Sequence, residues 1–144
     1  MKKNSTVFID ASAWIAVLDE QNPNHVQARE YYKKLIEQSA RLVTNNIVID
    51  ECLSVLKEKF GNEFAQQFLE TIDESVLSVT LRVDWISRRI RRNVINNFLK
   101  TSSSKHSMRQ YYVYESIKRK KVDIVFSYDE NLKAFDFPVM PQNV

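Results

Sequence analysis

The chain has 144 residues, of which 44% are hydrophobic and 27% are charged, and its formal net charge is +3. This length is sufficient for one domain with a hydrophobic core, and the composition argues against intrinsic disorder. The apolar runs are much shorter than the ~20 residues of a transmembrane helix. Glycine occurs once, at Gly61, which excludes the Gly-rich loops that bind phosphate. We therefore expect a single domain over residues 1–144.

Short strand patterns alternate with longer helical patterns along the chain. In chain order we predict a strand at 7–9, helices at 13–18 and 25–38, a strand at 41–44, helices at 47–60 and 63–72, a strand at 78–81, helices at 84–99 and 107–119, and strands at 124–126 and 139–140. This alternation is typical of a mainly parallel sheet that is covered by helices on both faces. In such sheets, ligands bind outside the carboxyl ends of the strands.

Three acidic residues occupy positions where a carboxylate is unusual. Asp10 ends the first predicted strand and Asp129 closely follows the fourth, so both fall on one edge of the predicted sheet. Glu51 lies on an apolar helical stripe with Val48 and Cys52. A carboxylate on the core side of a helix is costly unless it is paired or coordinated. Carboxylate oxygens are the ligands that Mg²⁺ and Mn²⁺ prefer, so these acids are candidates for a metal site.

Each acid also has an interpretation that needs no metal. Asp10 can cap the following helix, Asp129 can begin a turn, and Glu51 can pair with a lysine or a helix end. No rival catalytic set is convincing, because the two histidines have no partners at a recognisable spacing. Ser12 has no activating base and suits a helix cap or an orienting role. An aspartyl-phosphate mechanism would need a second acid at this position, so we set it aside.

Three motifs together define a family resemblance. Residues 7–19 read VFIDASAWIAVLD, residues 44–51 read TNNIVIDE, and residues 127–132 read SYDENL, followed by a short strand pattern at 139–141. In this combination the chain resembles PIN-domain proteins of the kind found as toxins in VapBC-type toxin–antitoxin pairs. The resemblance covers nearly the whole chain. It implies an α/β fold, a three-layer α/β/α sandwich around a mainly parallel sheet of about five short strands.

The resemblance also implies an activity and a site. The activity is metal-dependent endonucleolytic cleavage of RNA, with Mg²⁺ or Mn²⁺ as the cofactor. The implied catalytic and metal-binding residues are Asp10, Glu51 and Asp129, and the implied site-lining residues are Ser12, Asn45, Gln110 and Ser127. The implied partners are RNA, a small antitoxin protein and a second copy of the chain in a homodimer.

One position departs from the family pattern. The family carries a third acid in a Ser-x-x-Asp pattern that opens the helix before the last catalytic strand, whereas residues 107–110 here read Ser-Met-Arg-Gln. A glutamine offers a neutral carbonyl oxygen, and the adjacent Arg109 adds positive charge that disfavours a cation and favours a phosphate. Glu115 cannot easily substitute, because five residues on it points roughly 140° around the helix. Two functions remain open: a metal-dependent endoribonuclease, and a PIN-like module that binds nucleic acid or protein without cleavage.

Basic and aromatic side chains indicate where RNA would bind. Basic residues cluster at 88–92 and 118–121, although such runs usually lie on solvated helix faces. Tyr111, Tyr112 and Tyr114 fit either an RNA-stacking surface or packing in the core and at a subunit interface. A lone cysteine, Cys52, requires no oxidising compartment, and Met1 leads into a strand with no signal-peptide pattern. We therefore expect a cytoplasmic protein without a membrane partner.

Overall fold

The computed structural model describes residues 4–102, 105–135 and 137–141. In chain order its elements are β1 (Thr6–Ile9), α1 (Ala11–Leu18), α2 (His25–Glu37), β2 (Arg41–Asn45), α3 (Asn46–Phe60), α4 (Asn62–Leu77), β3 (Leu81–Asp84), α5 (Arg88–Lys100), α6 (Met108–Arg119), β4 (Ile124–Phe126), the short 3-10 helix η1 (Glu130–Ala134) and β5 (Val139–Met140). The strands form a five-stranded parallel sheet in the order β3-β2-β1-β4-β5. The predicted three-layer α/β/α sandwich is confirmed.

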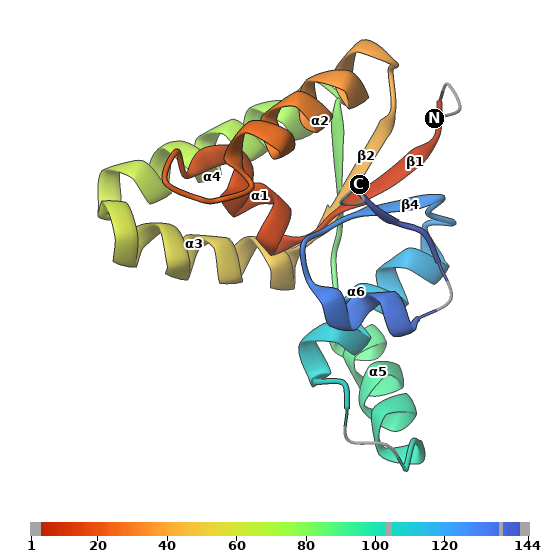
Figure 1. The fold of residues 1–144 in the computed structure, drawn as a ribbon. Coiled ribbons are helices and arrows are strands. Elements are labelled where there is room, and N and C mark those ends of the chain that lie inside the picture. Colours follow the sequence, from red (N-terminus) through yellow and green to blue (C-terminus); the bar gives the residue numbers. More distant parts are fainter. Residues whose placement is uncertain (1–3, 103–104, 136, 142–144) are drawn as a thin grey trace.

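The connections between strands decide which face each helix covers. The chain steps from β1 to β2 to β3 in one direction, through α1–α2 and α3–α4, and then returns through α5–α6 to β4 on the other side of β1. Because parallel crossovers are right-handed, the two directions place their helices on opposite faces. In Figure 1, α1 to α4 gather on the left of the strands, and α5 and α6 lie at the lower right.

The reversal of strand order lies between β1 and β4. In open α/β sheets, the crevice at the carboxyl ends of the two strands that flank such a reversal is where ligands bind. Here the backbone N–H of Asp10 donates to the carbonyl of Phe126 at 3.0 Å, which ties the ends of β1 and β4 together. The fold therefore points to the residues that follow these two strands.

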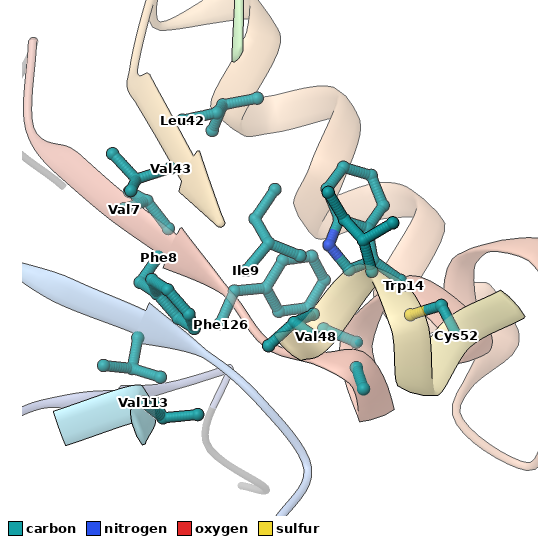
Figure 2. Close-up of a cluster of buried hydrophobic side chains, with 14 of the residues drawn as sticks. Val7, Phe8, Ile9, Trp14, Leu42, Val43, Val48, Cys52, Val113 and Phe126 are labelled. Carbon is teal, nitrogen blue, oxygen red and sulfur yellow. The ribbon is translucent and has the colours of Figure 1, made fainter. Parts of the chain in front are cut away.

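The core packs on both faces of β1. Val7, Phe8 and Ile9 are all fully buried, which explains why this strand reads as a continuous apolar run. Figure 2 shows Phe8 near Val113 of α6, while Ile9 lies on the side of Trp14, Val48 and Cys52. The buried helices on either side thus hold the carboxyl end of β1 in a fixed position.

The third strand is displaced from its predicted position. We predict a strand at 78–81, but Ser78 is the C-cap of α4, Val79 adopts a positive φ of 61°, and β3 begins only at Leu81. Asp84, which we expect to open a helix, is instead the buried last residue of β3. The next helix starts at Arg88, after Ser87 caps it by accepting a hydrogen bond from Ile90 N. The chain therefore turns before β3, and the following elements begin later.

Helix α4 and the segment after Asp129 also differ from the prediction. Helix α4 continues to Leu77, five residues beyond its predicted end at residue 72, and the 3-10 helix η1 is not predicted at all.

Within the described part of the chain, none of the helices combines the length and apolar character that crossing a membrane requires.

Candidate functional site

Asp10 occupies the junction between β1 and α1. Its backbone carbonyl accepts hydrogen bonds from Ala13 and Trp14 in the first turn of α1, but its side chain caps no helix N–H. The carboxylate is fully buried. The capping interpretation of this side chain therefore does not apply, and its carboxylate is directed to other partners.

Glu51 and Asp129 reach the same region from different elements. Glu51 lies in the second turn of α3, and its side chain is 37% exposed. Asp129 follows β4, and its Oδ1 accepts a hydrogen bond from Asn131 N at 3.0 Å, which caps η1. Its other oxygen, Oδ2, remains available to α6. Asp129 thus begins a turn, as one interpretation predicts, through Oδ1 alone, and its Oδ2 is free to take part in the site.

Arg109, in the first turn of α6, joins all three acids. Its Nε donates to Glu51 Oε1 at 2.7 Å and to Oε2 at 2.9 Å. Its Nη2 lies 2.6 Å from Asp10 Oδ1, and its Nη1 lies 3.3 Å from Asp129 Oδ2. The three predicted acids therefore converge on a single guanidinium, and we call this group, with Arg109, the acidic cluster.

Two predicted site-lining hydroxyls fix the carboxylates in place. Ser127 Oγ donates to Asp10 Oδ2 at 2.9 Å and accepts from Asp129 N at 3.0 Å. Ser12 Oγ lies 3.1 Å from Ser127 Oγ and accepts from Tyr128 N at 2.9 Å. Both serines therefore lie beside the acidic cluster, where they orient Asp10 and the backbone that carries Asp129.

Gln110 lies beside the cluster, but with its amide turned opposite to our expectation. Its Oε1 accepts from Ser107 N at 3.1 Å, and this bond belongs to a capping box at the start of α6. Its Nε2 donates to Asp129 Oδ2 at 3.0 Å. The helix end needs an acceptor and the carboxylate needs a donor, so this orientation satisfies both. Gln110 therefore presents an N–H group to the acids rather than a carbonyl oxygen.

Asn45, also predicted to line the site, makes its hydrogen bonds elsewhere. Its Oδ1 caps α3 through Val48 N at 2.8 Å, and its Nδ2 donates to Ser116 Oγ at 3.0 Å. Ser116 Oγ donates in turn to Asp84 Oδ2 at 2.8 Å, and Arg119 Nη1 lies 2.6 Å from Asp84 Oδ1. Asn45 thus belongs to a second buried polar network. Asp84 is not predicted as a site residue, because the third strand is predicted too early; an acid at the end of β3 is the signal that reveals it.

Charge in the acidic cluster is balanced only in part. Burial raises the pKa of Asp10 above its ordinary value, although Arg109 and the Ser127 hydroxyl oppose this shift. Burial also disfavours the charged form of Arg109, but Asp10 and Glu51 outweigh it and raise the pKa of the guanidinium. Arg109 therefore stays charged, and one positive charge faces three carboxylates.

The chemistry of the cluster suits a hard divalent cation, but its arrangement does not. Carboxylate oxygens are the preferred ligands of Mg²⁺ and Mn²⁺. Among the described residues, however, no group of three or more histidines, cysteines and acids is placed to hold a metal ion. The guanidinium of Arg109 lies among the carboxylates and binds an oxygen of each. As arranged here, these residues do not fit a metal.

Comparison with known proteins identifies the family. Residues 7–138 match the family model of the PIN domain. Among solved structures, VapC20 of Mycobacterium tuberculosis, described as a sarcin–ricin loop cleaving toxin, is 19% identical, with a TM-score of 0.72 over 91% of this chain and 95% of that one. A comparison with curated proteins finds no match. The structural likeness shows the same fold. Because the family model spans most of the sequence, this chain belongs to the PIN domain family.

Proposed function

We propose that this protein is a PIN-type endoribonuclease and the toxin component of a toxin–antitoxin pair. The observation that supports this most strongly is the convergence of Asp10, Glu51 and Asp129, from three separate segments, where the strand order reverses. We assign the catalytic role to these three carboxylates. Mg²⁺ or Mn²⁺ is the cofactor that family membership implies, and it becomes compatible with this site only once Arg109 has left the carboxylates.

RNA is the substrate class that we propose. The structurally similar VapC20 is described as cleaving the sarcin–ricin loop. In this chain, Arg88, Arg91 and Arg92 of α5 are exposed and line a surface hollow, where phosphate groups could bind. By the same family reasoning we propose a small antitoxin and a second copy of this chain as protein partners, a single domain over residues 1–144, and a cytoplasmic location.

Cleavage of RNA in the presence of Mn²⁺ tests the proposal. The natural protein should cleave at millimolar Mn²⁺, and Asp10→Asn or Asp129→Asn should abolish the cleavage. Asp50→Asn is the matched control, because Asp50 is an exposed neighbour of Glu51 on α3. This control should cleave like the natural protein. Cleavage that persists in Asp10→Asn would show that the acidic cluster is not the nuclease site.

A second candidate function is a PIN domain that binds RNA without cleaving it. The observation that favours it is the pair of donors from α6, Arg109 and Gln110, that occupy the carboxylates. In this case RNA shifts in a gel with the natural protein, but no product forms at any Mn²⁺ concentration. Cleavage and binding, measured on the same RNA, therefore separate the two functions.

A further inference from the structure

Arg109 fills the acidic cluster by means of three of its nitrogens. Its Nε bridges both oxygens of Glu51, while Nη2 and Nη1 contact Asp10 and Asp129. The Arg109 side chain is 25% exposed, and Asp10 beneath it is fully buried. Charge-assisted hydrogen bonds of this kind are roughly twice as strong as neutral ones. The guanidinium is therefore an integral part of the cluster rather than a surface group that lies across it.

A divalent ion and this guanidinium compete for the same oxygens. Mg²⁺ requires oxygen ligands at about 2.0–2.1 Å in a nearly octahedral arrangement. Arg109 already lies 2.6 Å from Asp10 Oδ1 and 2.7 Å from Glu51 Oε1. An ion bound to these oxygens would lie next to a second positive charge and within the space that the guanidinium takes. The two cations therefore exclude each other.

The neighbouring residue reinforces this arrangement. Gln110 donates to Asp129 Oδ2, the same oxygen that Arg109 Nη1 approaches. The capping box fixes the glutamine oxygen on Ser107 N, so the amide keeps its N–H group toward the acid. Two adjacent residues in the first turn of α6 thus offer only donors to the carboxylates, and neither offers an oxygen to a metal.

We propose that Arg109 is the resident cation of the acidic cluster and excludes divalent ions from Asp10, Glu51 and Asp129. A metal binds only when the Arg109 side chain moves out toward solvent. This inference deepens the proposed function, since it takes the same three acids as the site. It concerns the binding of cations alone, however, and can be tested without RNA.

Calorimetric titration with Mn²⁺ alone tests the exclusion. Arg109→Ala should bind Mn²⁺ more tightly than the natural protein by about tenfold or more, because the competing cation is gone. Arg109→Lys keeps a positive charge at this position and should bind as weakly as the natural protein. Arg29→Ala, which removes an exposed arginine from α2, controls for net charge and should change nothing. Equal binding of Mn²⁺ by Arg109→Ala and the natural protein would overturn the proposal.

Thermal unfolding gives a second measurement. Without metal, Arg109→Ala should melt at a lower temperature, because its carboxylates have lost their counter-charge. Mn²⁺ should restore the melting temperature of this variant and raise that of the natural protein far less. If Arg109→Ala does not fold, Arg109→Gln takes its place in both measurements. A natural protein whose melting temperature rises with Mn²⁺ as much as that of the variant would contradict the exclusion.

The two proposals fail in distinguishable ways. If Arg109→Ala gains Mn²⁺ binding but neither it nor the natural protein cleaves RNA, the nuclease function is wrong and the exclusion stands. If the natural protein cleaves RNA and binds Mn²⁺ as tightly as Arg109→Ala does, the exclusion is wrong and the nuclease function stands.

Discussion

Asp10 shows how one buried carboxylate is accommodated. Desolvation raises its pKa, and the largest opposing effects come from the Arg109 guanidinium at 2.6 Å and the Ser127 hydroxyl at 2.9 Å. Removing one partner of a buried charge pair is costly, since the other charge stays buried without compensation. Each carboxylate in the cluster has at least one donor from α6, so the position of this helix decides how the acids are neutralised.

An acid at position 110 should strengthen metal binding. In the Arg109→Ala background, Gln110→Asp should tighten Mn²⁺ binding by about 1–3 kcal/mol, as expected for an added charged partner. Without metal the same change should lower stability, because it removes the donor to Asp129 and places a second carboxylate near it. Titration with Mn²⁺ and urea unfolding measure the two effects. Unchanged affinity would mean that residue 110 does not face the cation.

At the scale of elements, an ion pair fastens the end of α1 to α3. Asp19 follows α1 and is 4% exposed; its Oδ2 lies 3.0 Å from Lys59 Nζ, and its Oδ1 accepts from Gln21 N at 2.9 Å. The hydrogen bond from Lys59, followed by that from Gln21, lowers the pKa of Asp19 below 3.8. A group with a lowered folded-state pKa stabilises the fold above its unfolded pKa, and this contribution is lost as the pH falls through the folded value.

Asp19→Asn should therefore destabilise the protein at pH 7 but progressively less below pH 3.8. Urea unfolding of both proteins across this range measures the difference. Lys57→Ala is the control for loss of a charge from α3, because Lys57 is exposed on the same helix as Lys59. This variant should show no such pH dependence. A destabilisation by Asp19→Asn that stays constant down to the lowest pH would exclude an electrostatic origin.

The elements were largely predictable because strand and helix patterns alternate so regularly. The start of β3 is not predictable in this way. Val79 and Thr80 have strand-forming side chains, but Val79 adopts a left-handed turn conformation. A positive φ is a genuine outlier for a β-branched residue, so no local signal announces it. The three acids are predictable from their positions after strands and on a helix stripe. Arg109 is predictable only as a nearby positive charge, because its partners Glu51 and Asp10 lie 58 and 99 residues away in sequence.

At the scale of the whole molecule, the exposed basic residues bear on where the proposed RNA substrate would bind. The arginines of α5 at positions 88, 91 and 92 are exposed and share one hollow, whereas Arg119 is engaged with buried Asp84. Tyr111 and Tyr114 pack against Phe135 within the protein. Packing therefore accounts for these two aromatic rings, and α5 is the better candidate for phosphate contacts.

RNA affinity should fall steeply with added salt, because bound phosphates release counterions. Replacing Arg88 and Arg92 with alanine should make the slope of log affinity against log salt shallower by about 0.7 for each phosphate that the protein no longer neutralises. Arg29→Ala again serves as the control for charge. Filter binding at several salt concentrations gives the slopes, and identical slopes would place α5 outside the binding surface.

The long sequence separations within the acidic cluster have a kinetic consequence. Asp10 meets Arg109 across 99 residues and Ser127 across 117, so these contacts close only when most of the chain is in place. Ordering such long loops is entropically costly, and we expect these contacts to be absent from the folding transition state. Arg109→Ala should then leave the refolding rate nearly unchanged and raise the unfolding rate, which stopped-flow measurements in urea can separate. A slower refolding rate would instead place the cluster in the folding nucleus. On this expectation, Arg109 determines how long the native state persists and not how quickly it forms.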